Sequence, residues 1–150
     1  MTGAPKAPNL TFEGRYSDEL VRAGIATFPA TFLRWQKDLN VSDGAALTAL
    51  SIFSFYIEGA RWPSVSKRRL AGWRGVSRDQ IENEMRELET LGFLTRTSKD
   101  PKWGSYYCDL SGLLTRLRVA ADAERRIKSL RVEEGAIRAE VATAALEERH

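Results

Sequence analysis

The sequence predicts a mainly α protein with a small β-hairpin wing and a long C-terminal helix. Apolar residues recur three and four positions apart after Ser77 and again after Ser111, which is typical of amphipathic helices. Between these stretches, residues 93–97 and 105–110 are rich in apolar, aromatic and β-branched side chains and flank a turn with Pro and Gly, which predicts two strands. The 150 residues are enough for one domain with a buried core.

The N-terminal part is predicted to contain a lead segment and the first core helices. Residues 1–14 are rich in Pro, Gly and Ala, so we expect a flexible N-terminal arm. The predicted domain covers residues 15–110, and residues 28–39 would pack under it. Ser42 and Asp43 can cap the central helix of the core. The apolar residues of that helix are Ala46, Leu47, Leu50, Ile52, Phe53, Tyr56 and Ile57.

Residues 66–78 form a basic segment that leads into the second amphipathic helix. It holds five positive charges and no acidic residue. The basic residues are Lys67, Arg68, Arg69, Arg74 and Arg78. Leu70, Ala71 and Trp73 would give a short first helix its apolar face. Gly75 would permit a turn, and Ser77 would cap the second helix. A basic segment before a helix N-terminus is typical of helix-turn-helix proteins that contact phosphates.

The second helix is amphipathic but acidic. Ile81, Met85 and Leu88 fall on one face, so at about 100° per residue the opposite face carries polar side chains. That polar face consists of Asp79, Asn83, Arg86 and Thr90, flanked by Gln80 and Glu87. We expect most of the glutamates to lie on the flanks. After Gly92 the two predicted strands, joined by a turn at residues 99–104, would form a wing.

Several short motifs occur in an order that a known family shares. They are Phe28-Pro29, Trp62-Pro63-Ser64, Leu70-Ala71, Gly75-Val76-Ser77, Ile81, Leu88-Glu89-Thr90-Leu91-Gly92-Phe93-Leu94 and Tyr107. With them, residues 24–117 resemble the winged helix-turn-helix domains of replication initiators and regulators of phages, plasmids and other mobile elements. This group includes the N-terminal domains of DnaD-like replication proteins. The family usually has Thr or Ser where this chain has Gln80. The resemblance implies a winged helix-turn-helix that binds duplex DNA.

We expect DNA contacts from the basic segment, the second helix and the wing. Between Arg61 and Gly104 ten basic residues oppose six acidic ones, although the formal net charge of the chain is only +3, which fits a local DNA-binding face. Phosphate contacts are predicted for Lys67, Arg68, Arg69 and Arg74. Base contacts are predicted for Arg78, Gln80 and Asn83, with Ser77 and Arg86 beside them. Wing contacts are predicted for Arg96, Lys99, Lys102 and Trp103.

Residues 111–150 are predicted to form a C-terminal helix, because no Pro interrupts them. A heptad pattern with one charged member runs through Ala120, Ala123, Ile127, Leu130, Glu134, Ile137, Val141 and Ala144. A helix continuous to Glu148 would be on the order of 55 Å long, although Gly135 is a point where it could break. The helix could form a homodimer, fold back on the domain or bind another protein. The predicted dimerisation residues are Ile127, Leu130, Ile137 and Val141.

The residue types present exclude several classes of site. Cys108 is the only cysteine and His150 the only histidine, which excludes a disulfide, a Cys/His zinc site and a Ser-His-Asp triad within one chain. We therefore expect no enzyme activity, no metal site and no cofactor. No run approaches the ~20 apolar residues of a transmembrane helix, and the first residues lack the features of a signal peptide. We expect a cytoplasmic protein.

The sequence favours a protein that binds specific sequences of double-stranded DNA. Its role would be transcriptional regulation or replication initiation with origin recognition, in the setting of a mobile element. The alternative is a non-catalytic adaptor, whose acidic helix and C-terminal helix bind a protein partner in a replication, transcription or defence complex. DNA binding at low salt distinguishes the two, because an adaptor would show none.

Overall fold

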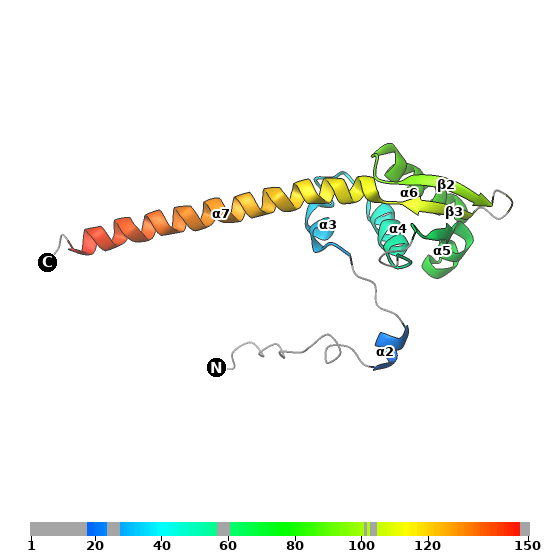
Figure 1. Cartoon of the computed structure of the whole chain (residues 1–150), viewed down its shortest axis with the longest axis horizontal. Helices are drawn as coiled ribbons and strands as arrows, with labels where there is room; N and C mark the ends of the chain where they lie inside the picture. Colours follow the sequence, from blue (N-terminus) through cyan, green and yellow to red (C-terminus); the bar gives the residue numbers. More distant parts are fainter. Residues whose placement is uncertain (1–17, 24–27, 57–60, 101, 103–104, 148–150) are drawn as a thin grey trace.

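The computed structural model describes residues 18–23, 28–56, 61–100, 102 and 105–147 (Figure 1). The predicted N-terminal arm, residues 1–14, and Trp103 lie outside these ranges. The described helices are α2 (Asp18–Ala23), α3 (Ala30–Trp35), α4 (Asp43–Phe53), α5 (Lys67–Arg74), α6 (Arg78–Thr90) and α7 (Ser111–Glu147). The strands are β1 (Ser64–Ser66), β2 (Thr95–Asp100) and β3 (Ser105–Asp109). This confirms the predicted fold class: mainly α, with a small hairpin wing and a long C-terminal helix.

Serine caps and two glycines set the ends of α5 and α6. The Ser77 hydroxyl accepts a hydrogen bond from the backbone N–H of Gln80 at 3.0 Å, and Ser66 caps α5 in the same way. Gly75 follows α5 with φ 64°, and Gly92 follows α6 with φ 75°, a backbone conformation that glycine adopts most easily. The predicted turn between two helices is therefore confirmed, and α6 packs on both α5 and α4.

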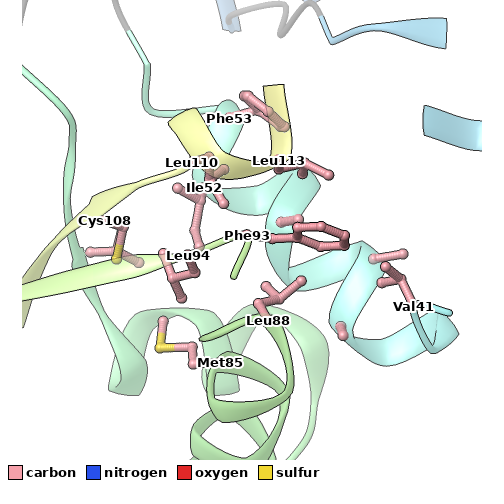
Figure 2. Close-up of a cluster of buried hydrophobic side chains, with 14 of the residues drawn as sticks. Val41, Ile52, Phe53, Met85, Leu88, Phe93, Leu94, Cys108, Leu110 and Leu113 are labelled. Atoms are coloured by element: carbon pink, nitrogen blue, oxygen red, sulfur yellow. The ribbon is translucent and has the colours of Figure 1, made fainter. Parts of the chain in front are cut away.

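One apolar core joins the helices to the sheet. Ile81, Met85 and Leu88 of α6 are fully buried, as the spacing predicted. Figure 2 shows Met85 and Leu88 in one cluster with Ile52 of α4 and Leu113 of α7. Burying each such side chain stabilises the fold by roughly 1.5–3 kcal/mol. The core thus fixes α6 against α4 and against the start of α7.

The sheet is antiparallel with strand order β1-β3-β2. In the pairing of β1 with β3, Val65 lies opposite Tyr106. The sequence pattern placed the first hairpin strand from Phe93 to Thr97, but β2 begins two residues later and continues to Asp100. The side chain of Phe93 is buried in the core, so its apolar character reflects packing after α6 rather than strand pairing.

The long helix α7 has a packed part and a free part. Leu113, Leu117 and Ala120 are buried, and α3 lies against this first part. Over residues 125–144 every side chain is exposed, and Figure 1 shows this part extending away from the domain. The helix has 37 residues, and Gly135 does not interrupt it. Folding back of the whole tail onto the domain is therefore not the observed arrangement.

Some apolar side chains predicted to be buried are exposed. Leu47 of α4 is exposed, and Trp73 is 63% exposed. The central helix ends at Phe53, so Tyr56 lies beyond it and is exposed, while Ile57 lies outside the described residues. Leu70 and Ala71 form the buried face of α5, and Trp73 falls about 110° from its centre at about 100° per residue. An eight-residue helix that buries one narrow face leaves such a residue outside.

Candidate nucleic-acid interface

The exposed face of α6 carries the side chains that the sequence placed there. Its exposed residues are Asp79, Asn83, Arg86 and Thr90. This face is opposite to the fully buried Ile81 and Met85. Arg78, the first residue of α6, and Gln80 are also exposed. The predicted base-contacting residues therefore share the solvent-facing side of α6, toward its N-terminal end.

Glu82 binds three cations from α5, α6 and β2. Its carboxylate accepts hydrogen bonds from Lys67 Nζ at 3.0 Å and from the two Nη atoms of Arg96 at 2.8 and 2.9 Å. The Nε of Arg86 donates to it at 3.1 Å. The Tyr106 ring of β3 lies 5.4 Å from Lys67 Nζ and 4.8 Å from Arg96 Cζ, within the range of cation–π attraction. This cluster holds the wing against α6 and α5.

Two residues predicted to contact DNA, Lys67 and Arg96, are bound to Glu82 in this cluster. Hydrogen bonds from Arg96 hold the pKa of Glu82 at about 2, and the same bonds raise the pKa of Arg96, so both groups are charged near neutral pH. Arg96 also pairs with Glu89, and its side chain is only 10% exposed. Lys67 is partly buried in its pair with Glu82. We therefore revise the prediction that Lys67 and Arg96 contact the DNA backbone. Their charges form ion pairs with glutamates and stabilise the domain.

A second network lies on the buried side of α6, around Glu84. Its carboxylate accepts from Thr48 Oγ1 at 2.6 Å and forms an ion pair with Arg74. Arg74 also donates to Thr48 Oγ1 at 2.9 Å and to the carbonyl of Gly44 at 3.4 Å. Burial opposes ionisation of Glu84, but the hydrogen bonds from Arg74, Thr48 and Gln80 outweigh it and lower the pKa. This network joins α4, α5 and α6.

The Glu84 network also changes the role of Arg74. The Arg74 side chain is 16% exposed and cannot reach a phosphate without leaving Glu84, which would then be a buried, unpaired charge. A Cβ on Gly44 would lie 2.4 Å from Glu84 Oε1, so the glycine makes room for the carboxylate. The predicted phosphate contact of Arg74 is therefore revised to an internal ion pair.

The same pairings remove most of the negative charge from the surface of α6. Glu82, Glu84 and Glu89 are paired with cations. Glu87 accepts from Ser42 Oγ at 2.6 Å. Asp79 is the exposed carboxylate of α6 that forms no ion pair with any residue the structure describes. Most of the carboxylates of α6 are thus bound by cations or a hydroxyl of the same domain.

Three arginines of the basic segment remain available. Arg68, Arg69 and Arg78 are exposed, and none forms an ion pair within the described ranges. The first turn of α5 contacts α6 through the ion pair between Lys67 and Glu82. Arg68 and Arg69 directly follow Lys67 in that turn, and Arg78 begins α6.

The exposed Trp73 lies on α5 near two of these arginines. A shallow open hollow is lined by Ser66, Arg68, Arg69, Gly72 and Trp73. The Trp73 ring stacks on Phe55 with centroids 5.3 Å apart. A flat aromatic surface beside two arginines can accept a nucleic-acid base or a protein side chain.

The wing adds two exposed lysines. Lys99 Nζ lies 5.8 Å from the centre of the Tyr107 ring. Lys102 is exposed, and its backbone N–H donates to Asp100 Oδ1 at 3.0 Å, which shapes the tip. Trp103, predicted to contact DNA from this tip, lies outside the described residues. The wing contacts of Lys99, Lys102 and Trp103 therefore stay predictions.

The predicted dimerisation residues are all on the free part of α7. Ile127, Leu130, Ile137 and Val141 are 45%, 64%, 60% and 64% exposed. The free part begins where Glu124 accepts hydrogen bonds from Arg34 at 2.7 and 2.9 Å and from the Trp35 indole at 2.7 Å. These bonds fasten α7 to α3 at the edge of the domain.

The role of Glu84 was missed from the sequence, although a signal for it exists. Glu84 stands three residues after Ile81 and four before Leu88, so helical periodicity places it on the buried face. A carboxylate on that face requires a cation or hydrogen-bond donors. The partner could not be read from the spacing, because Arg74 approaches from another helix.

Comparisons with known proteins find similarity to a solved structure. No protein-family model matches the chain, and no curated protein matches it significantly. The described helices include none that is long and apolar enough to cross a membrane. The structure is similar to the crystal structure of the N-terminal domain of DnaD protein from Geobacillus kaustophilus, with a TM-score of 0.54 and 21% sequence identity. The match covers 74% of this chain and 92% of that domain, and the two therefore share a fold.

Proposed function

We propose that this protein is a non-enzymatic, sequence-specific binder of double-stranded DNA that inserts α6 into the major groove. The observation that carries the proposal is the sorting of charges around α6. The glutamates of this helix are bound by Lys67, Arg74, Arg96 and Ser42 inside the domain. Three arginines, two in the first turn of α5 and one at the start of α6, face solvent.

The exposed cations have two roles in this proposal. Arg68 and Arg69 would contact phosphates, together with Lys99 and Lys102 from the wing, and would set the position of α6 on the duplex. These contacts carry no sequence information. They would make binding strongly dependent on salt, because each neutralised phosphate releases counterions.

Base recognition would come from the N-terminal half of α6. Arg78 can bind guanine and Asn83 can bind adenine in bidentate geometry, with Gln80 and Arg86 beside them. Asp79 on the same side can accept from the amino group of cytosine. Ser77 would act indirectly, as the cap that fixes the first turn of α6.

The shared fold with a domain of DnaD supports a role in replication initiation, with origin recognition as the task of α6. Transcriptional regulation uses the same kind of contact, and a mobile element would suit either role. Selection of bound sequences from a random duplex pool would identify the site and hence the process.

The proposal is tested by titrating fluorescent mixed-sequence duplex with the protein at several salt concentrations. We expect binding at low salt that weakens steeply as salt rises. Changing both Arg68→Ala and Arg69→Ala should reduce the slope of log affinity against log salt by about one to two. The matched control is Lys37→Ala with Arg116→Ala, which removes the same charge from exposed positions outside α5, α6 and the wing.

Base reading is tested separately on the selected site. Asn83→Ala should weaken binding to that site by about 1–3 kcal/mol and leave binding to random duplex nearly unchanged. Equal losses on both duplexes would show that Asn83 contacts only the backbone.

Absence of duplex binding at low salt would overturn the proposal. In that event the adaptor hypothesis would replace it, with the exposed surfaces of α5 and α7 as the places for a protein partner. The internal pairing of the α6 glutamates makes α6 itself a poorer acidic docking surface than its composition indicates.

A further inference from the structure

We propose that the free part of α7 pairs with the same segment of a second copy, and that the two helices run antiparallel. This inference does not depend on DNA binding. It starts from an aliphatic stripe on a helix that nothing in the described chain covers. The stripe consists of Ile127, Leu130, Ile137 and Val141, with exposed fractions of 45–64%.

The stripe has the geometry of a helix–helix contact. Its members are separated by three, seven and four residues, and Glu134 occupies the missing heptad position. At about 100° per residue these side chains stay within one side of the helix. Large aliphatic side chains in that arrangement are exposed to water in the single chain. Contact with a partner that carries a matching stripe would bury them. A second copy of the chain supplies one.

Charge along the helix selects the direction of pairing. Residues 125–131 carry four basic side chains and no acidic one. Residues 133–147 carry four acidic side chains and one basic one. Two copies side by side in parallel would place basic against basic and acidic against acidic. Antiparallel copies centred near Val132 place the basic residues 125–131 of each against residues 133–139 of the other, which include Glu133 and Glu134.

Glu134 supports the same direction. It lies within the stripe, where a parallel pair would bring the two Glu134 carboxylates together across the contact. Like charges at such a position destabilise the pair. An antiparallel pair with its two-fold axis near Val132 instead places Glu134 beside Leu130 of the second copy, next to the basic segment. The same axis places Ile127 opposite Ile137.

Antiparallel pairing would also keep the two domains apart. Each α7 leaves its domain at Glu124, where Arg34 and Trp35 hold it to α3. A two-fold axis near Val132 would place the two domains at opposite ends of the paired segment. The contact is isologous, so it closes at two copies.

Disulfide trapping tests the direction. The variants Ile127→Cys and Ile137→Cys are prepared separately in the full chain and oxidised mildly, alone and as a mixture. Native Cys108 is fully buried, and burial raises the pKa of its thiol to about 12, so it gives little background reaction. We expect a cross-linked dimer in the mixture and little in either variant alone.

Every other trapping result would overturn the antiparallel arrangement. Efficient cross-linking of each variant with itself would show a parallel pair. Cross-linking in none of the samples, with the thiols accessible to a small reagent, would show that the stripes do not meet. A further control is Ser129→Cys, because Ser129 lies off the stripe. Mixing this variant with Ile137→Cys should give little cross-linked dimer.

Sedimentation equilibrium tests the pairing itself. At micromolar concentration the unmodified protein should have a measured mass of twice that of the 16.9 kDa chain. The double variant Ile127→Asp with Ile137→Asp should sediment as the monomer, with an unchanged near-ultraviolet circular dichroism spectrum because its domain stays folded. A monomeric unmodified protein would overturn the proposal. A dimer that persists in the double variant would also overturn it, because pairing would then use another surface.

Discussion

The two parts of α7 have the same secondary structure but very different surroundings. In residues 111–124 the apolar side chains Leu113 and Leu117 are at most 3% exposed. In residues 125–144 the equally apolar Leu130 is 64% exposed. Both parts follow the three-and-four spacing of an amphipathic helix. The comparison shows that spacing identifies the face of a helix, whereas only the neighbouring elements decide whether that face stabilises the fold.

The largest expected difference between the two parts comes from removing a leucine side chain. Leu113→Ala should lower the free energy of unfolding by about 2–5 kcal/mol, because it leaves a cavity in the core. Leu130→Ala should change it by no more than about 0.5 kcal/mol in the monomer. Urea unfolding at low protein concentration measures both. A large loss in the monomer for Leu130→Ala would mean that the free part packs on its own domain.

Replacing two glycines of α7 with alanine should change the stability of the protein in opposite directions. A Cβ on Gly112 would lie 2.1 Å from the backbone oxygen of Gly92, so Gly112→Ala should destabilise the domain by about 1–3 kcal/mol. A Cβ on Gly135 meets no atom within 4 Å. Gly135→Ala should therefore stabilise the helix by about 0.5–1 kcal/mol. Thermal unfolding monitored at 222 nm compares them, and a loss of stability in Gly135→Ala would indicate a contact at that site.

Ion pairs provide a third contrast, which depends on pH. The pKa of Glu82 is about 2 in the folded protein, below its usual 4.5. The unfolded state therefore takes up the proton first as pH falls. The stability from Glu82 is fully present above about pH 4.5 and is lost as pH approaches 2. Glu82→Gln should reduce the dependence of stability on pH in this window by up to about 1.4 kcal/mol per pH unit.

The matched control for Glu82 is an ion pair on the free part of α7. Glu134 pairs with Arg138, and both side chains are well exposed. Glu134→Gln should change the stability of the monomer by only about 0.3–0.5 kcal/mol. Unfolding curves between pH 5 and pH 2.5 compare the two variants with the unmodified protein. Parallel curves for Glu82→Gln and the unmodified protein would contradict the role assigned to the Glu82 cluster.

The smallest expected effect lies at the boundary between the two parts. Glu124→Ala removes the carboxylate that accepts hydrogen bonds from Arg34 and Trp35. The Arg34 side chain in this pair is exposed. We expect only a small loss of global stability, because solvent screens the ion pair between Glu124 and Arg34. Hydrogen exchange should nevertheless accelerate locally in α3 and in the neighbouring turn of α7. Unchanged exchange there would show that apolar packing alone holds α3 on α7.

Features that depend on neighbouring residues could be predicted from the sequence. The cap at Ser77, the turn at Gly75, the buried face of α6 and the continuous C-terminal helix follow from local conformation and helical spacing. The offset of β2 and the exposure of Trp73 did not follow, because both depend on which residues the rest of the domain covers.

The charges of the basic segment show where local reasoning ends. The sequence by itself determined that residues 66–78 are basic and that α6 is acidic. Only the tertiary structure decided which charges remain at the surface, since Arg74 meets Glu84 from another helix and Arg96 meets Glu82 from the wing. Helix capping and periodicity act within one or two turns of the chain. Ion pairing depends on distances in space, which exist only once the core has brought these elements together.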